Sequence, residues 1–129
     1  MAATRITPQD VPPGGDWNIA GVTIDDANGN VLANPPGRRT RVYFHCPAAA
    51  SADVTIASNG ATLRPGRNRF GEVQNPDIEF TVENDEASTD NIYEVVLPSA
   101  RLNDASDDVT ITYAAVAGTV TVAAVVEDI

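Results

Sequence analysis

Apolar and polar side chains alternate along 40-TRVYFHC-46, which places Val42, Phe44 and Cys46 on one face of an extended chain. The opposite face carries Arg41, Tyr43 and His45. Alternation with a period of two indicates a β-strand in a sheet that has one buried side. This stretch therefore predicts a strand over residues 40–46.

Further segments repeat this pattern, while no stretch combines a sustained helical period with helix caps. The clearest are 52-ADVTIAS-58, 77-DIEFTVE-83, 91-NIYEVVL-97, 109-VTITYAAVA-117 and 119-TVTVAAVV-126. Short strands at regular spacing predict an all-β fold, an antiparallel β-sandwich or barrel of about eight strands.

Two hairpins are expected within this fold. The segment 28-NGN-30 carries the Asn-Gly pair of a type I′ turn, which would join a strand in 17-WNIAGVTIDD-26 to 31-VLA-33. A turn near Gly118 would join the last two segments into a closing hairpin.

The chain divides into an N-terminal arm, residues 1–16, and a single β-domain, residues 17–129. The arm contains four prolines and glycines in a row, 12-PPGG-15, and proline removes backbone donors and fixes φ. It reads either as a disordered tail or as an extended arm that orders on a partner. The start has no apolar signal-peptide core, and no apolar stretch is long enough to span a bilayer.

Charge is strongly lopsided, with 18 acids against eight Arg, no Lys and a net charge of −10. Such a surface repels nucleic acids and anionic membranes, so neither is expected as a partner. The absence of Lys fits either a GC-rich genome or a high-salt cytoplasm, in which acidic surfaces are screened.

Side chains that perform catalysis are scarce. His45 and Cys46, the single His and the single Cys, are neighbours and point to opposite faces of a regular strand, so they form no nucleophile–base pair. Zinc needs Cys/His clusters, which are missing. We therefore predict no catalytic residue, no cofactor and no metal ligand, and leave open a loose Ca²⁺ site in 103-NDASDD-108.

The arginines are unevenly distributed. Six of the eight fall in two clusters expected to be loops: Arg38, Arg39, Arg41 and Arg64, Arg67, Arg69. If both clusters share one end of the domain, the molecule is electrostatically two-sided and its basic side suits an acidic partner. The alternative is two ordinary polar loops.

Three stretches resemble small structural proteins of tailed viruses, a group of head proteins that includes capsid decoration, or cement, proteins. They are the hairpin motif in 25-DDANGNVL-32, the strand in 53-DVTIASNG-60 and the ending 118-GTVTVAAVVEDI-129. The similarity covers residues 17–126, and the Pro-rich start and the Arg-rich 64–69 loop depart from the group's pattern.

The resemblance implies a virion protein on the capsid surface, made in the host cytoplasm, that acts without catalysis or cofactor. Its partners would be the major capsid protein and copies of itself, as a homotrimer at local three-fold axes. The expected interface comprises the Arg clusters and the arm residues Pro8, Val11, Pro12 and Pro13. Deleting residues 2–15 would then abolish capsid binding and leave the fold intact.

Two other functions remain open. A low-copy virion part, such as a head–tail connector or a fibre base, would have the same fold and differ in copy number. A carbohydrate- or ligand-binding β-sandwich would need exposed aromatic rings on one face, for which Tyr43 is the candidate.

Overall fold

The structure is a computed structural model that describes residues 3–10, 21–60, 62–63, 73–74, 76–84 and 90–128. Twelve strands and one helix of four residues occur in these residues. In chain order they are β1 (Thr4–Ile6), β2 (Gln9–Asp10), β3 (Val22–Thr23), β4 (Asn30–Ala33), β5 (Arg38–Cys46), β6 (Ser51–Ile56), β7 (Thr62–Leu63), β8 (Val73–Gln74), β9 (Ile78–Glu83), β10 (Asn91–Leu97), α1 (Ser99–Leu102), β11 (Asp108–Ala117) and β12 (Thr121–Asp128). No helix in these ranges is long and apolar enough to cross a membrane.

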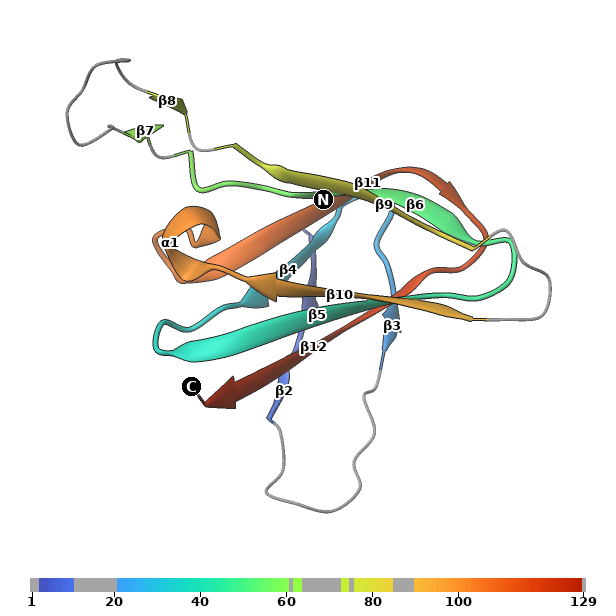
Figure 1. The fold of residues 1–129 in the computed structure, drawn as a ribbon, viewed down its shortest axis with the longest axis horizontal. Helices are drawn as coiled ribbons and strands as arrows, with labels where there is room; N and C mark the ends of the chain where they lie inside the picture. Colours follow the sequence, from blue (N-terminus) through green and yellow to red (C-terminus); the bar gives the residue numbers. More distant parts are fainter. Residues whose placement is uncertain are drawn as a thin grey trace.

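Two five-stranded sheets form a sandwich, which confirms the predicted all-β class with more strands than expected (Figure 1). Sheet A has the order β1-β4-β11-β6-β9. Sheet B has the order β10-β5-β12-β2, and β3 also pairs with β12. The short ribbon of β7 and β8 extends beyond the sandwich. Each of the six clearest segments in the sequence overlaps one of the longer strands.

The core lies between the sheets and consists mainly of aliphatic side chains from alternate strand positions. Val42 and Phe44 from sheet B meet Val54 and Ile111 from sheet A, and all four are almost completely buried. Phe44 also contacts Phe80 edge-to-face, with ring centroids 5.8 Å apart. The inward face predicted for residues 40–46 is therefore confirmed.

The N-terminal segment is part of the sandwich, so the arm predicted for residues 1–16 is wrong for residues 4–10. Strand β1 pairs in parallel with β4, and β2 pairs in parallel with β12, so one short segment borders both sheets. Ile6 is 4% exposed and belongs to the core. Pro8 lies between the two pairings, where its missing N–H removes no ladder hydrogen bond. Residues 11–16 lie outside the described residues.

These parallel pairs make both sheets mixed, whereas the sequence predicts an antiparallel sandwich or barrel. A proline-rich start suggested an unpaired arm because proline cannot donate a hydrogen bond. The pairing partners, however, lie in β4 and β12, which are remote in sequence. Only the assembled sandwich brings the two sheet edges close enough to share one segment.

The Asn-Gly turn exists but joins two different sheets, so the predicted first hairpin is wrong. Strand β3 pairs with β12 in sheet B, whereas β4 pairs with β1 and β11 in sheet A. The N–H of Gly29 donates to the carbonyl oxygen of Asp25 at 2.7 Å, and Gly29 has a φ of 80°. This tight turn carries the chain across the sandwich.

The predicted closing hairpin is also wrong, because β11 belongs to sheet A and β12 to sheet B. The ladder between β11 and β6 shifts register between Ala114 and Ala117, and Ala115 has a φ of 51°. Gly118 follows with a φ of 67°. A bulge and a glycine bend the chain sharply, and the last strand crosses to the centre of sheet B.

Candidate interaction surface

The outer face of sheet B contains a shallow apolar depression with a volume of about 390 Å³. It lies where the outward side chains of β5, β10 and β12 meet, because Tyr43 pairs in register with Glu94 on one side and Ala123 on the other. The lining residues are Gly21, Tyr43, His45, Ile92, Thr121 and Ala123. The floor is thus formed by regular strands, which hold it rigidly.

Two exposed aliphatic side chains lie on the same outer face as this depression. Ile92 is 68% exposed and Val96 is 46% exposed, and both point outward from β10. Val22 of β3, at the other edge of sheet B, is 47% exposed, but it pairs with the core residue Val122 and therefore lies on the inner side of the sheet. In a chain with a net charge of −10, two exposed aliphatic side chains beside an apolar depression make this face the candidate interaction surface.

Beside the depression lies a network of two arginines and two glutamates whose charges cancel. Arg41 donates from Nε to Oε1 of Glu127 at 2.7 Å and from Nη1 to Oε1 of Glu94 at 2.8 Å. Arg39 Nη1 is 3.6 Å from the same Glu127 oxygen. The hydrogen bond from Arg41 lowers the pKa of the Glu127 carboxyl below its ordinary value. This face therefore presents ordered, neutralised charge.

The first predicted Arg cluster lies in a strand and not in a loop. Arg38, Arg39 and Arg41 all belong to β5, because β5 pairs with β12 as far as Arg38 opposite Asp128. Arg38 Nη2 is 3.0 Å from the carboxylate of Asp10. These guanidinium groups are thus bound to acids of the same chain, which fixes their positions on sheet B.

The other predicted interface residues are not placed. Arg64, Arg67, Arg69, Val11, Pro12 and Pro13 lie outside the described residues. Whether the two Arg clusters share one end of the molecule therefore stays a prediction. Among the residues predicted for the interface, only the three in β5 and Pro8 are described.

His45 and Cys46 point to opposite sides of β5, as the alternation predicted. His45 lines the outer depression, with Nε2 3.4 Å from the carboxylate of Asp90. Cys46 is completely buried in the core, and this burial raises the pKa of its thiol. A Cys–His nucleophile pair therefore does not form.

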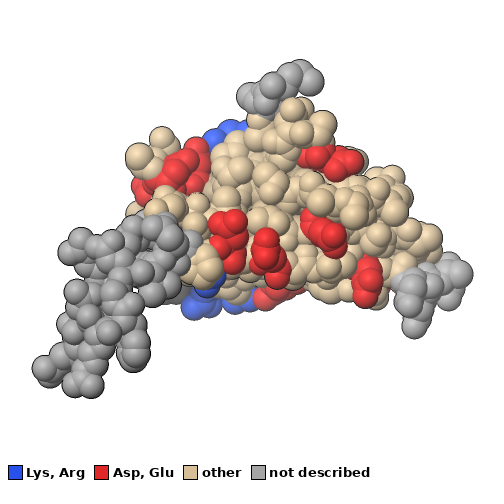
Figure 2. All heavy atoms as spheres, turned by 90° about the horizontal axis from the view of Figure 1, so that it is seen from above, with Lys and Arg blue, Asp and Glu red and all other residues tan. Residues whose placement is uncertain are grey.

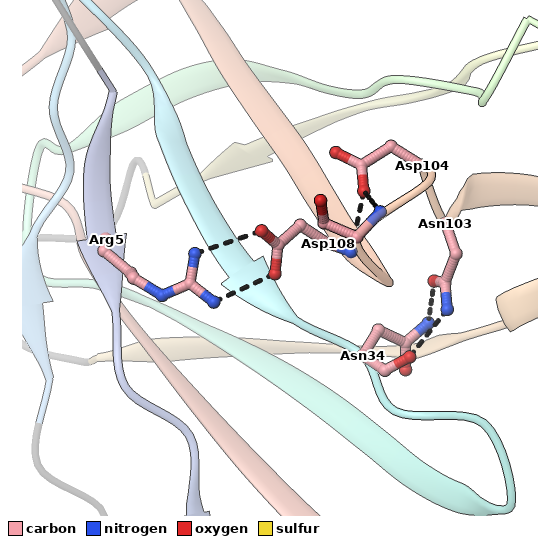
Figure 3. A network of polar contacts seen from close by, with 6 residues as sticks. Arg5, Asn34, Asn103, Asp104 and Asp108 are labelled. Atoms are coloured by element: carbon pink, nitrogen blue, oxygen red, sulfur yellow. Dashed lines mark hydrogen bonds and ion pairs between the residues drawn. The ribbon is translucent and has the colours of Figure 1, made fainter.

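The acidic loop at residues 103–108 uses its carboxylates to hold the fold together (Figure 3). Oδ1 of Asp104 accepts hydrogen bonds from the backbone N–H groups of Ser106 and Asp108. Both carboxylate oxygens of Asp108 accept from Arg5 in β1, at 2.9 and 3.2 Å. Across the described residues, no group of three or more His, Cys, Asp or Glu side chains is arranged to hold a metal ion.

The outer face of sheet A has a different character. Its strands expose acids and threonines, among them Asp53 of β6 and Glu79, Thr81 and Glu83 of β9. Strands β6 and β9 lie at the top of Figure 1. The view from that side shows acidic side chains spread over the surface (Figure 2). The two outer faces therefore differ: one is acidic and polar, and the other is apolar with balanced charges.

The contribution of β10 and β12 to this surface is not evident from the sequence. In 91-NIYEVVL-97 apolar residues occupy both alternating sets, with Ile92 and Val96 in one and Tyr93 and Val95 in the other. Such a strand is normally buried on both faces. In the structure β10 is instead an edge strand of sheet B, and its outward residues Ile92 and Val96 are exposed. This placement depends on the order of strands in the sheet.

Comparison of the chain with protein-family models, with curated proteins and with solved structures gave no match. The resemblance to capsid decoration proteins thus rests on the three sequence motifs.

Proposed function

We infer that this chain is a non-enzymatic structural protein of a virus particle, a capsid decoration protein that covers the outside of an icosahedral head. The outer face of sheet B is its attachment surface. The observation that carries the proposal is the apolar depression at Tyr43, rimmed by the exposed Ile92, on an otherwise strongly acidic chain.

Attachment through sheet B follows from the contrast between the two faces. Covering the depression removes apolar surface from water, at about 25 cal/mol per Å². The network of Arg39, Arg41, Glu94 and Glu127 adds polar contacts at the rim and holds no net charge that would repel a partner. The acidic outer face of sheet A then remains in solvent, where it keeps decorated particles apart.

The decoration role requires many weak contacts and not one strong one. Each copy contributes a modest interface, and the contacts add across a lattice through the high effective concentration of neighbouring copies. The major capsid protein is the proposed partner, and assembly as a homotrimer at local three-fold axes is the arrangement that the sequence resemblance implies. The virion surface is accordingly the proposed location, after synthesis in the host cytoplasm.

The first test is the copy number of this chain in purified virus particles, measured by quantitative mass spectrometry against the major capsid protein. Decoration predicts a fixed ratio near one copy per capsid subunit, or a large fraction of that. A handful of copies per particle would instead favour a connector or fibre base. Absence from particles would overturn the virion proposal.

The second test locates the attachment surface by rebinding purified protein to particles that lack it. Tyr43→Ala removes the ring from the depression and should weaken rebinding at least about tenfold, since large aromatic side chains dominate interface energies. Thr112→Ala, an exposed change on the outer face of sheet A, is the matched control and should bind as the wild type does. Equal binding by both variants would place attachment elsewhere.

A second candidate function is carbohydrate binding in the same depression. It is favoured by Tyr43 and His45, which line the depression together and offer an aromatic face beside a polar ring. A glycan array with the wild type and Tyr43→Ala tests it: a glycan whose signal disappears in the variant would support this function, and a blank array would exclude the glycans tested.

A further inference from the structure

One side of the sandwich is closed by the N-terminal segment, and the other side leaves two edge strands, β9 and β10 (Figure 1). Strand β9 pairs with β6 alone, and β10 pairs with β5 alone, among the strands that the structure describes. An unpaired edge is a template for another strand, so natural sheets usually protect it with charges, prolines or bulges.

Strand β9 is protected in this way. Its exposed positions carry Glu79 and Glu83. Its end is also capped, because the hydroxyl of Tyr93 donates to the Glu83 carbonyl oxygen at 2.9 Å and accepts from the Glu83 N–H at 3.2 Å. An incoming strand would have to displace this cap and desolvate the carboxylates.

Strand β10 has none of these protections. Its seven residues include no proline or glycine, and its ladder with β5 runs without a register shift from Asn91 to Leu97. Its outward side chains are Ile92, Glu94 and Val96, and the one charge among them is neutralised by Arg41 at 2.8 Å. This is a regular, apolar edge, whereas β9, the edge strand of sheet A on the same side of the sandwich, is shielded.

The pattern on β10 is self-complementary. Ile92 and Val96 lie symmetrically about Glu94, two positions away on either side. In an antiparallel pairing of two β10 strands centred on Glu94, Ile92 of each copy lies opposite Val96 of the other. Paired β-branched side chains of this kind stabilise a sheet, and the symmetry is that of a two-fold interface.

Charge also favours a second copy at this place. The whole chain carries −10, which would keep copies apart, but the surface beside β10 carries two arginines and two glutamates that cancel. The two Glu94 side chains would meet at the axis, each already paired with Arg41 of its own chain. Two copies can therefore approach here with little of the repulsion found on sheet A.

We propose that β10 is a self-association site, at which two copies pair their β10 strands antiparallel about Glu94 and join their B sheets into one continuous sheet. The proposal stands apart from the decoration role, because it concerns two copies in solution without a particle. A seven-residue strand buries less than a standard interface, so the dimer should form at micromolar concentrations. On a crowded lattice such a contact would link neighbouring copies.

Sedimentation velocity of the full chain over a micromolar concentration series tests the proposal. The wild type should show a reversible monomer–dimer equilibrium. The double variant Ile92→Asp/Val96→Asp places like charges opposite each other and should weaken dimerisation at least about tenfold. Val22→Asp makes a similar change at a comparably exposed residue on β3 and should dimerise as the wild type does.

A charge-swap experiment separates a broken interface from a broken fold. Ile92→Lys/Val96→Lys should be as monomeric as the Asp variant. An equimolar mixture of the two should restore dimers, since each Lys then lies opposite an Asp. Heterodimers in the mixture, with both variants folded by circular dichroism, would support the pairing. Three results would each overturn the proposal. The wild type could be monomeric, both double variants could associate as the wild type does, or the mixture could stay monomeric.

Discussion

The hydroxyl of Tyr113 donates a hydrogen bond of 2.7 Å to Oδ1 of Asn30, and this bond ties β11 to the start of β4 beneath the N-terminal strand. Asn30 is completely buried, and its side chain also accepts from the N–H of Asp25 at 3.2 Å and donates to the carbonyl oxygen of Thr4 at 3.0 Å. One amide thus connects three segments that are remote in the sequence. Burial also raises the pKa of the Tyr113 hydroxyl, which keeps it a donor.

Replacing Asn30 should be costly because its side chain is completely buried and makes three hydrogen bonds. Asn30→Ala leaves a hydroxyl, an N–H and a carbonyl oxygen without partners, and we expect a loss of about 2–4 kcal/mol in the free energy of unfolding. Tyr113→Phe removes one bond and should cost about 1 kcal/mol. Tyr93→Phe, whose hydroxyl is near solvent, is the control. Urea unfolding measures the loss of stability in each variant. A loss in Asn30→Ala no larger than the loss in Tyr93→Phe would contradict the prediction.

Two glycines with the same backbone conformation should respond differently to a methyl group. Gly29 and Gly37 have φ values of 80° and 82°, so alanine is strained at both by about 1 kcal/mol. A Cβ on Gly29 would lie 2.6 Å from the carbonyl oxygen of Ile111, whereas a Cβ on Gly37 meets nothing within 4 Å. We expect Gly29→Ala to cost about 3 kcal/mol in all, and thermal unfolding of both variants measures the difference. Equal melting temperatures would refute the close packing of this turn.

The N-terminal strand should contribute to stability, against the sequence-based expectation that deleting residues 2–15 leaves the fold intact. Ile6→Ala opens a cavity in the core and should cost about 2–4 kcal/mol in the free energy of unfolding. Arg5→Ala changes the neighbouring residue and breaks its surface ion pair with Asp108, so it should cost clearly less than Ile6→Ala. Deleting residues 2–10 should unfold the protein or expose the β4 and β12 edges to aggregation. A truncated protein with unchanged urea unfolding would show that the segment only rests on the surface.

Acid should weaken the network on sheet B. The pKa of Glu127 is lowered in the folded state by the hydrogen bond from Arg41, so its stabilising effect is complete above its ordinary pKa of 4.5. That effect is lost as the pH falls through the lower folded pKa. Protonating the many other acids relieves the repulsion among negative charges and so raises stability as the pH falls. The effect of Glu127 is therefore measured as the difference in stability between the wild type and a variant.

Melting temperatures of the wild type and Glu127→Gln, recorded from pH 7 to pH 3, isolate the contribution of Glu127. The stability difference between them should be largest near neutral pH and shrink below about pH 4.5. Glu79→Gln, at an exposed position on sheet A, serves as the control. A Glu127→Gln difference that is independent of pH would rule out the ionised pair as its cause.

The sequence predicted local structure well where one strand carries its own signal. The alternation in 40–46 placed Val42 and Phe44 in the core and Tyr43 and His45 outside, and the structure agrees. It also excluded a Cys46–His45 pair, because neighbouring residues in a strand point apart. Such inferences need only the period of the strand, which no tertiary contact changes.

Predictions of which strands pair were wrong wherever they rested on closeness in sequence. Asn28 and Gly29 do form a turn, yet the strands beside it belong to different sheets. Residues 109–126 read as a hairpin, and the bulge at Ala115 separates the two strands. A turn motif specifies a reversal of the chain, whereas pairing depends on which edges are already occupied.

The sequence by itself determined that this is an all-β protein with an aliphatic core, since period-two alternation and the lack of a helical period leave no other way to bury those side chains. Only the tertiary structure decided that the first residues close one side of the sandwich, that Arg41 is bound by Glu94 and Glu127, and that β10 is an exposed apolar edge. The reason is physical: burial at a given strand position depends on the neighbouring strands, and these come from distant parts of the chain.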